Sequence, residues 1–450
     1  MDLEGFVRHR IDRTSDDELG ALLARRIAEH KAIGDEDALR LARAVIDEVR
    51  ISLDARSDVC AWEPSRVTMG RFGVGSRGTG DMHAHRCIAQ VIGRTSAAID
   101  ALDLDDAGVV ASPLGGHLVV TVDGMHSRLS EFPFLAGFHA ARAALRDVWV
   151  MGARPLAMLA DVHLADDGDV ARILDFTAGI AAVGEAVDVP LVTGSTLRIG
   201  GDLVLGERLT GCVGAVGEAP GDHLLGRRGL EPGDLLLETE GAGGGTISTT
   251  AIYGGFPEVI DETLNVDFLD ACAHLSEHLV WQRLHAMTDV TNGGLRGDVH
   301  EMAGTTGLGI VVRPERALAL VAPKVRRMLD RLEIDPLGVS VDALLAAGRP
   351  DDIADAGAVL DGLGLRWDVV GEVRATPGVV QVLDGIEAPF APRFRESPYT
   401  PVKKVVGDRT PDDFGEMASR VSAAAERAAE KKRRIVDRLR RSRSKADRQP

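Results

Sequence analysis

A proline- and glycine-rich stretch at residues 219–233 divides this chain of 450 residues into two blocks of similar pattern. In each block, short apolar runs of strand length alternate with longer helical runs, and glycines separate them. Strands that alternate with helices favour a sheet covered by helices. Because one average domain holds ~100–200 residues, the sequence predicts a mixed α/β (α+β) protein with two domains.

Helical extensions flank these two blocks. An apolar stripe near the N-terminus, typical of a packing or oligomerisation appendage, consists of Leu19, Leu22, Leu23 and Ile27, and the last residues form a helix rich in Ala and Arg. We therefore expect a helical extension at 1–55, a first domain at 66–218, a second domain at 225–375, an irregular proline-containing segment at 376–410 and a basic helical tail at 411–450.

The overall charge is strongly negative, because 69 acidic residues outnumber 52 basic ones and leave a net charge of −17. An acidic surface repels phosphates, so nucleic-acid binding is not expected of the chain as a whole. No apolar run approaches the ~18 residues of a membrane span. Four cysteines without a CxxC pair indicate neither a disulfide scaffold nor a cysteine zinc site. These features predict a cytoplasmic protein with no membrane partner.

The C-terminal tail reverses this charge. Residues 415–450 contain 12 Lys/Arg and 5 Asp/Glu, which gives this stretch a net charge of +7. A charged run is usually the solvated face of a helix, and exposed ion pairs stabilise by only about 0–1 kcal/mol each. We therefore expect removal of the residues after Thr410 to cost little stability. The alternative is that the tail binds an acidic protein partner or RNA.

Five glycines lie within residues 70–80, and residues 73–78 match the GxGxxG pattern of dinucleotide-binding loops. Such a loop normally follows an apolar strand, and residues 66–71 are not apolar. Glycines interleaved with Arg71 and Arg77 are more typical of a mobile loop that folds over a polyphosphate. Three interpretations stay open: a phosphate-covering loop, a dinucleotide site and a turn-rich linker.

Carboxylates stand at the ends of apolar segments. Asp105 precedes a strand, Asp123 ends the next strand, Asp147 lies inside an apolar helix, and Asp289 follows a short apolar run. A carboxylate within an apolar stretch is costly unless it is paired or bound to a cation. Mg²⁺ with ATP takes oxygen ligands from several segments of a chain. Each aspartate alone is more often a cap or turn residue, but together they favour a metal–nucleotide site.

Two further patterns are weaker. Residues 241–246 contain four glycines after a strand, and they form either a nest of N–H donors for an anion or a flexible turn. His274 and His278 are four residues apart on a helix, which is a zinc-like spacing. No HExxH glutamate accompanies these histidines, so packing is the better interpretation of the pair.

Several motifs occur together in a family-like order. Thr121–Gly124 contains Asp123, and residues 144–155 contain Arg-Asp followed by Met-Gly-Ala-Arg-Pro. The other matching stretches are Leu-Asp-Asp-Ala-Gly-Val at 104–109, Glu-Pro-Gly-Asp at 231–234, Met-Thr-Asp-Val-Thr-Asn-Gly-Gly-Leu at 287–295 and Val-Val-Gly-Glu-Val at 369–373. In these motifs the chain resembles the aminoimidazole ribonucleotide (AIR) synthetase-like ATP-binding superfamily, which includes selenophosphate synthetase, thiamine-monophosphate kinase, the purine cyclo-ligase and a hydrogenase maturation enzyme.

The resemblance implies a fold and an assembly. Members of this superfamily have two α/β domains, and the sheets of two N-terminal domains pair into a barrel within a homodimer. ATP lies in a cleft between subunits and domains. The resemblance therefore implies a homodimer that binds ATP and Mg²⁺ and acts on a small-molecule substrate.

The chain departs from the family pattern at two acidic positions. Ser195 stands in Thr-Gly-Ser-Thr where the family has Gly-Gly-Asp-Thr, and Asn292 replaces the second aspartate of the later signature. Fewer carboxylates leave more of the Mg²⁺ ligation to phosphate and water, unless Asp202 or Asp298 compensates. The glycine loop also lacks the Cys and Lys pair of selenophosphate synthetase, and the C-terminus lacks the terminal Cys of the hydrogenase enzyme. The chain thus resembles a separate branch.

The resemblance assigns expected roles to individual residues. It implies an ATP- and Mg²⁺-dependent phosphoryl transfer to an unidentified small-molecule or carbonyl/amide acceptor. The alternative is a non-catalytic nucleotide-binding maturation or regulatory protein, which Ser195 and Asn292 favour. The implied metal–triphosphate ligands are Asp105, Asp123, Asp147 and Asp289; the implied nucleotide contacts are Gly73, Gly75, Arg77, Gly78, Gly80, Gly194, Thr196 and Thr291; the candidates for acid–base work are His83, His85 and His126.

Overall fold

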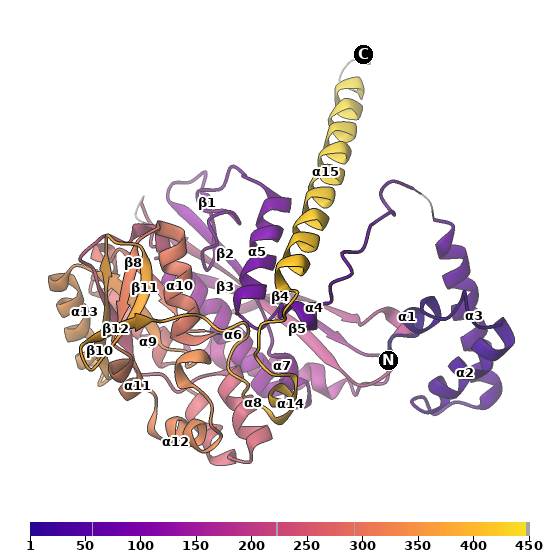
Figure 1. Ribbon diagram of the computed structural model, residues 1–450, viewed down its shortest axis with the longest axis horizontal. Helices are drawn as coiled ribbons and strands as arrows, with labels where there is room; N and C mark the ends of the chain where they lie inside the picture. The colour runs from indigo at the N-terminus through magenta and orange to yellow at the C-terminus, as the bar shows by residue number, and fades with distance from the viewer. Residues whose placement is uncertain (56, 222–223, 292, 447–450) are drawn as a thin grey trace.

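The computed structural model describes residues 1–55, 57–221, 224–291 and 293–446. Two β-sheets with helices packed on them form the body, and helical extensions leave it at both ends of the chain (Figure 1). The predicted mixed α/β fold with helical termini is confirmed. The four cysteines are free.

The first sheet has five strands in the order β1-β2-β5-β3-β4. All neighbours in it are antiparallel except β3 and β4. Two helices, α6 (Pro133–Val150) and α7 (Ala171–Ala186), pack together, and α6 also contacts this sheet. The strands are β1 (Gly108–Ala111), β2 (His117–Gly124), β3 (Arg154–Leu164), β4 (Leu191–Arg198) and β5 (Leu209–Ala219).

The face of this sheet that points away from α6 is uncovered. Val122 of β2 pairs with Gly214 of β5, and Gly214 pairs with Leu159 of β3, so these residues lie in one row across the sheet. The exposed fractions are 65% for Val122, 40% for Leu159 and 56% for Leu197 on β4. β4 is an edge strand that is exposed along nearly its whole length. Apolar side chains on an open sheet face mark a surface suited to association.

The second sheet has seven strands, and the four at residues 235–239, 286–289, 309–312 and 344–348 are buried along nearly their whole length. Two apolar clusters form on its sides, one of them shared with the first domain. Its strand order is β12-β11-β8-β10-β6-β9-β7. The strands are β6 (Leu235–Thr239), β7 (Ala286–Asp289), β8 (Gly309–Val312), β9 (Leu344–Gly348), β10 (Trp367–Arg374), β11 (Gly378–Leu383) and β12 (Ile386–Pro389). The helices are α8 (Gly245–Gly254), α9 (Asp267–Glu277), α10 (Gly294–Thr306), α11 (Pro314–Leu320), α12 (Pro323–Arg331) and α13 (Pro350–Gly362).

The segment 376–410, expected to be irregular, instead contains regular structure. β11 and β12 form a hairpin that extends the second sheet, and α14 (Pro401–Val406) follows. The turn between the strands is Asp384-Gly385, and both residues have a positive φ, as a tight hairpin turn requires. The prolines of this segment lie beside the strands and at the helix start, where they do not interrupt hydrogen bonding.

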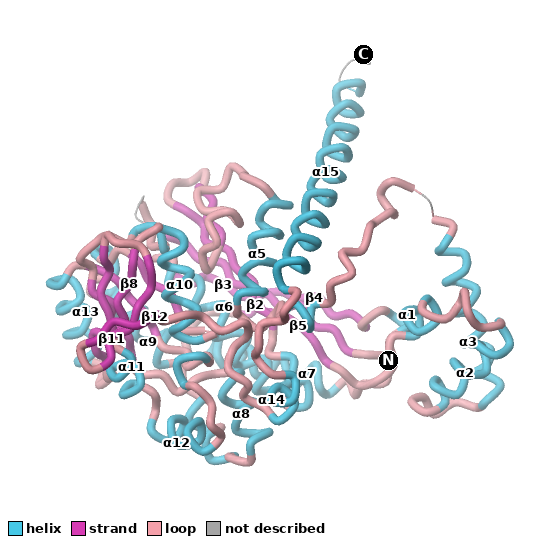
Figure 2. The backbone as a smooth tube through the Cα atoms, viewed as in Figure 1, coloured by secondary structure: helices cyan, strands magenta, loops and turns pink. Residues whose placement is uncertain are grey.

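The N-terminal extension forms a small helical lobe at one side of the molecule (Figure 2). It comprises α1 (Leu3–Arg8), α2 (Asp16–Ala28) and α3 (Asp35–Leu53). Of the predicted stripe residues, Leu19, Leu23 and Ile27 are fully buried in its own apolar cluster, which also includes Leu205 of the first domain. The lobe is therefore attached to the loop that precedes β5. Leu22 is 38% exposed and lies outside this cluster, so the prediction was wrong for that residue.

The C-terminal helix α15 (Phe414–Ala446) has two different halves. Its first half packs on α5 (Thr79–Ile92), and Met417 forms a buried cluster with Phe72 at the end of α4 (Met69–Phe72). Its second half projects from the body (Figure 1). The expectation that removal after Thr410 costs little stability is therefore wrong for the first half, because that cut would expose Phe72. No helix among the described residues is long and apolar enough to cross a membrane.

Candidate functional site

A cleft of about 950 Å³ lies where the first sheet, α5, α10 and the linker between the domains meet. Its lining combines apolar side chains with many charged ones. The charged side chains include Arg77, His85, Asp105, Asp106, Asp147 and Arg227.

Carboxylates from four separate segments cluster at this cleft: Asp106 and Asp147 line it, and Asp123 and Asp289 act on Asp147 without being part of the lining. Asp106 precedes β1, Asp123 lies near the end of β2, Asp147 lies on α6, and Asp289 ends β7 of the second domain. Their pKa values are all raised, first because the groups are withdrawn from water and then because they repel one another. For Asp147 the effect is largest: Asp289, Asp123 and Asp106 all act on it, and its pKa lies well above its ordinary value.

These carboxylates have fewer hydrogen bonds than their position demands. Thr121 Oγ1 donates to Asp147 Oδ2 at 2.8 Å. Asp106 Oδ2 is buried and has no hydrogen-bond partner among the described residues. A buried oxygen without a donor or a cation is costly, so these groups are suited to a positively charged ligand.

Arginines compensate part of this negative charge. Arg227 Nη2 lies 2.5 Å from Asp106 Oδ1, and its Nη1 lies 2.8 Å from Glu301 Oε2. Arg146 Nε on α6 lies 3.1 Å from Asp289 Oδ2. Carboxylates and arginines from the two domains therefore alternate in and beside the cleft.

Arg146 also forms an ion pair with Asp342, which Arg142 approaches at 3.6 Å. Burial disfavours the ionised form of Asp342, but the two arginines outweigh this effect and lower its pKa to about 2. Both arginines are at most 4% exposed. Helix α6 of the first domain is thus fixed to the second domain through buried charges.

The glycine loop at residues 73–80 is held by Asp81 at the start of α5. The N–H groups of Gly75 and Arg77 donate to the two carboxylate oxygens of Asp81 at 2.9 and 2.8 Å. A Cβ on Gly293, at the start of α10, would lie 2.4 Å from the carbonyl oxygen of Arg77. The loop therefore rests directly on the second domain. The side chain of Arg77 approaches Glu301 at 3.4 Å.

The segment after β12 closes the other side of this loop. The N–H of Glu396 donates to the carbonyl oxygen of Ser76 at 2.8 Å. A Cβ on Gly78 would lie 2.0 Å from the carbonyl oxygen of Phe394, and one on Gly80 would lie 1.7 Å from that of Phe72. Glycine is thus required at both positions by close backbone approach.

The three candidate histidines lie in different surroundings. His85 lines the cleft and approaches Asp81 at 3.6 Å. His83 faces α15 instead, where its Nε2 lies 3.1 Å from Ser422 Oγ. His126 is removed from the cleft: its Nε2 lies 2.7 Å from Tyr399 Oη and its Nδ1 lies 3.1 Å from Thr249 Oγ1. Burial, together with nearby Lys403 and Arg128, lowers the pKa of His126 to about 4.

The other expected nucleotide contacts divide into two groups. The N–H of Thr291 donates to Asp298 Oδ2 at 3.2 Å, beside the acidic cluster. Gly194 and Thr196 lie on the edge strand β4, which three strands separate from β1 beside the cleft. Within one chain the structure therefore does not bring these two residues to the cleft.

The departures from the family pattern have different outcomes. Asp298 is 1% exposed and interacts with Arg77, Asp289 and Glu301, so it lies within the acidic cluster. Asp202 is paired with Arg198 on the surface and lies outside the cluster. Ser195 lies on the exposed strand β4. Asn292 falls outside the described residues.

Comparison with known proteins identifies the fold. Residues 104–219 match the model of the AIR synthase related protein N-terminal domain, and residues 231–384 match that of its C-terminal domain. The chain belongs to the AIR synthase related family. The cleft described above lies between these two domains of the family.

Several relatives share this family fold. The chain is 46% identical over 457 aligned residues to "Uncharacterized protein MJ1416" of Methanocaldococcus jannaschii, and the match covers 99% of this chain and 100% of that protein. It is 30% identical to carbamoyl dehydratase HypE of Rhodobacter capsulatus, over 57% of this chain and 74% of that protein. The solved structure "AaThiL complexed with AMPPCP and TMP" has a TM-score of 0.54 and 18% identity, and it covers 69% of this chain and 94% of that chain.

The AIR synthase related motifs locate Asp123, Asp147 and Asp289 but not the residues that neutralise them. In the Asp-Asp motif the family resemblance assigned the ligand role to Asp105. No site role was predicted for Asp106, Arg146, Arg227 and Glu301. Two signals were present: Arg227 stands in the basic turn between the domains, and Arg146 immediately precedes Asp147 inside an apolar helix. A charge of either sign within an apolar helix calls for a buried partner of the opposite sign.

Proposed function

We propose that this protein binds Mg-ATP in the cleft between its domains and transfers the terminal phosphoryl group to a small-molecule acceptor, through a carbonyl or amide oxygen. One observation carries the proposal: aspartates from both domains converge at a cleft, repel one another, and include a buried oxygen with no partner. A bound cation would relieve both the repulsion and the missing bond.

The donor set suits Mg²⁺ because it consists of carboxylate oxygens. Among the described residues, no group of three or more His, Cys, Asp or Glu side chains is arranged to hold a metal ion. Mg²⁺ needs no such cage, since it is usually bound by one or two carboxylates together with substrate phosphates and water. In this proposal one or two of the predicted ligands would hold it together with the phosphates, with Asp106 nearby; these ligands are Asp105, Asp123, Asp147 and Asp289. The ion would supply charge neutralisation at the phosphates.

The chain's own residues would bind and enclose the nucleotide. Arg77 and the loop N–H groups would cover the phosphates, with the loop held in shape by Asp81. Arg227 lies beside the acidic cluster, where its guanidinium stabilises negative charge. His85 is the histidine at the cleft and would contact the acceptor. Positioning and charge neutralisation are the main contributions in phosphoryl transfer.

The relatives support this proposal by name. One is a carbamoyl dehydratase, and a structure with the same fold was solved with AMPPCP and TMP. We infer from these names that the present chain handles a triphosphate nucleotide. The acceptor of this chain is not specified by them, because the two relatives act on different compounds.

Two substitutions test the site. Asp123→Asn and Asp147→Asn remove a negative charge but keep the shape of the side chain. We expect each to weaken Mg-ATP binding at least about tenfold, which corresponds to about 1.4 kcal/mol, while NAD binding stays undetectable. Asp202→Asn is the matched control, since Asp202 is exposed and outside the cluster. Unchanged ATP affinity in both cleft variants would refute the assignment.

We also propose that two chains associate through the uncovered face of the first sheet. That association would cover Val122, Leu159 and Leu197, and it would bring Gly194 and Thr196 on β4 towards a second chain. Light scattering should then give a mass near twice 47.8 kDa. Val122→Asp combined with Leu197→Asp should produce monomers. A wild-type monomer at micromolar concentration would contradict the proposal.

A non-catalytic nucleotide-binding protein is the second candidate, because Ser195 removes one carboxylate of the family pattern. Both candidates predict Mg-ATP binding, but only the enzyme turns ATP over when its acceptor is present. A thermal-shift screen of metabolites with a non-hydrolysable ATP analogue would identify the acceptor. ATP hydrolysis measured with that compound then separates the two candidates.

A further inference from the structure

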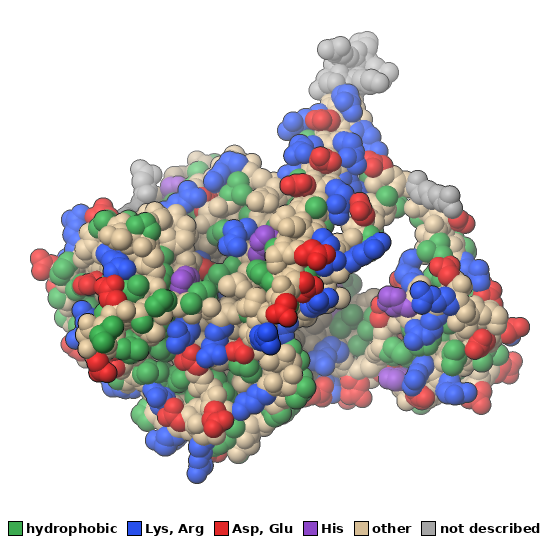
Figure 3. Space-filling view, in the orientation of Figure 1, with side chains coloured by type: hydrophobic (Ala, Val, Ile, Leu, Met, Phe, Trp, Pro, Cys, Tyr) green, Lys and Arg blue, Asp and Glu red, His purple; other side chains and the backbone are tan. Residues whose placement is uncertain are grey.

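The second half of α15, residues 431–446, is a cationic helix that is anchored at its start and then projects from the body. Residues 431–443 contain eight Lys/Arg and one Asp. Figure 3 shows blue side chains gathered along this projection, and it contrasts with the mixed charge of the body. Arg433, Arg438, Arg440 and Arg443 are exposed and have no acidic partner among the described residues. The function proposed above makes no use of them.

Because the helix projects, these arginines lie at a distance from the acidic body. Two contacts anchor the start of this half: Lys432 Nζ donates to the carbonyl oxygens of Val91 and Ile92, and Arg434 pairs with Asp58 at 3.0 Å. Arg443 lies nine residues further, about 14 Å along the axis at about 1.5 Å per residue. The Debye length is about 8 Å at physiological ionic strength. The net charge of −17 therefore does not repel a polyanion from the tip of the helix.

The arrangement of the arginines suits phosphates on two sides. At about 100° per residue, Arg433, Arg434, Arg438, Arg440 and Arg443 spread over about 220° of the helix circumference. A single flat partner would use one stripe, whereas the walls of a nucleic-acid groove surround a helix. Arginine also binds phosphate through two parallel hydrogen bonds, which lysine does not do.

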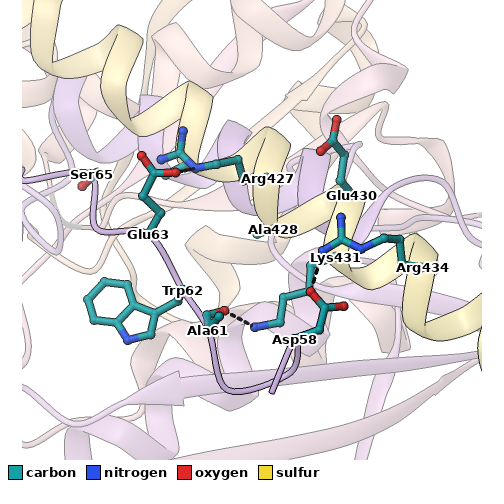
Figure 4. A pocket seen from close by; sticks show the side chains of 11 residues that line it. Asp58, Ala61, Trp62, Glu63, Ser65, Arg427, Ala428, Glu430, Lys431 and Arg434 are labelled. Atoms are coloured by element: carbon teal, nitrogen blue, oxygen red, sulfur yellow. Dashed lines mark hydrogen bonds and ion pairs between the residues drawn. The ribbon is translucent and has the colours of Figure 1, made fainter. Parts of the chain in front are cut away.

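An exposed aromatic ring lies beside the base of this helix. Trp62, 79% exposed, lies on the loop that runs along α15 (Figure 4). It lines a hollow of about 680 Å³ together with Arg427, Lys431 and Arg434. The loop is fixed there, because Lys431 Nζ donates to the carbonyl oxygen of Ala61 at 2.6 Å and Arg427 lies 3.2 Å from Glu63. An exposed indole next to cations is a surface on which an unpaired base stacks.

We propose that the second half of α15 and Trp62 form a binding site for a structured RNA that has an unpaired loop. The arginines would contact phosphates on both sides of a groove, and Trp62 would stack on an unpaired base. B-form DNA offers phosphates but no unstacked base, so the aromatic ring favours RNA. An acidic protein partner is less well matched, because the exposed apolar side chain of Leu439 stands among the arginines at 438, 440, 441 and 443 rather than in an apolar patch.

The test uses the full-length protein and a fluorescein-labelled RNA stem–loop, with fluorescence anisotropy measured over a series of salt concentrations. Arg438→Gln, Arg440→Gln and Arg443→Gln are combined in one variant, and glutamine preserves the helix. We expect the plot of log affinity against log salt to lose about two to three units of slope, since each phosphate contact contributes about 0.7–0.9. Trp62→Ala should weaken binding about five- to a hundredfold, with the slope retained.

A matched control removes three cations elsewhere. Arg13, Arg43 and Arg327 are exposed, and changing all three to glutamine alters the net charge equally. This control should bind RNA like the wild type, and all variants should bind Mg-ATP unchanged, which separates this inference from the proposed function. Absence of RNA binding at low salt would overturn the proposal. So would equal loss in the control variant, or equal affinity for a DNA duplex or for poly-glutamate.

Discussion

The interdomain cleft and the second half of α15 are both rich in charge, but they use it in opposite ways. In the cleft, Arg146 and Arg227 are at most 4% exposed, and each lies between two carboxylates. On α15, Arg438 and Arg440 are exposed and face solvent. The same side chain thus fixes two domains together in one region and stays available for a partner in the other.

The difference is one of solvation. Taking a charge out of water costs several kcal/mol, so a buried charge must be paired, and loss of its partner leaves that cost uncompensated. An exposed charge keeps its water, and its ion pairs contribute about 0–1 kcal/mol. The comparison therefore predicts large stability effects in the cleft and small ones on the projecting helix.

The largest effect is expected at Arg146. Arg146→Met keeps the apolar length of the side chain but leaves Asp289 without its cation and Asp342 with Arg142 alone. Breaking a buried ion pair on one side costs about 3–5 kcal/mol. Chemical denaturation should show this loss in the free energy of unfolding. Arg316→Met, at the exposed pair with Asp368, is the matched control and should cost about 1 kcal/mol or less. If both variants lose about 1 kcal/mol or less, the buried pair stabilises no more than the exposed one, which would contradict the comparison.

A packing effect of similar origin is expected within α15 itself. Met417 is 1% exposed and packs against Phe72. The helix residues from 435 onward follow the ion pair of Arg434 with Asp58. Met417→Ala should cost about 2–5 kcal/mol, as large-to-small changes in a core do. Deletion of 435–450 should change the free energy of unfolding by less than about 1 kcal/mol. If the deletion is as damaging as the substitution, the second half of the helix is packed rather than free.

The buried histidines between the domains give the comparison a pH dependence. His139 Nε2 lies 2.8 Å from Ser248 Oγ. Burial, and secondly the nearby Arg142, lower the pKa of His139 to about 3. The pKa of His126 falls to about 4. Because an unfolded histidine has a pKa of about 6.5, the unfolded state binds more protons below that pH.

The contribution of the buried histidines to stability should therefore fall as the pH decreases from 7 to 5, by about 2 kcal/mol each, whereas the raised pKa values of Asp147 and its neighbours act in the opposite direction. Denaturation curves at both pH values test this, and His126→Gln should remove about 2 kcal/mol of the difference. His117→Gln serves as the control, since His117 is not buried. If His126→Gln and the wild type change equally in stability between pH 7 and pH 5, His126 is solvated rather than buried in its neutral form.

Much of the architecture was predictable because it depends on local patterns. The division at residues 219–233, the N-terminal stripe of Leu19, Leu23 and Ile27 and the helical tail all follow from periodicity and turn residues. The hairpin around Asp384-Gly385 was missed, although Asp-Gly between alternating apolar residues is a strong hairpin signal. The neighbouring prolines favour irregular structure, so the sequence predicted no hairpin there.

The site was predictable only in part. Motifs located Asp123, Asp147 and Asp289, because each occupies a recognisable place at a strand end or in a helix. The partners of these residues depend on how two domains meet, and sequence spacing does not encode that. Arg227 reaches Asp106 and Glu301 across 121 and 74 residues of sequence. Gly194 and Thr196 illustrate the same limit, since their distance from the cleft depends on sheet order.

The most direct test of the central claim is calorimetric titration of the full-length protein with a non-hydrolysable ATP analogue, with Mg²⁺ and then with EDTA. The charge of the cleft predicts the result: mutually repelling aspartates oppose a bare triphosphate, and Mg²⁺ bridges the two. We expect saturable binding with Mg²⁺, at least about tenfold weaker binding in EDTA, and loss of this Mg²⁺ dependence in Asp147→Asn. Equal affinity with and without Mg²⁺, or no binding in either condition, would contradict the account.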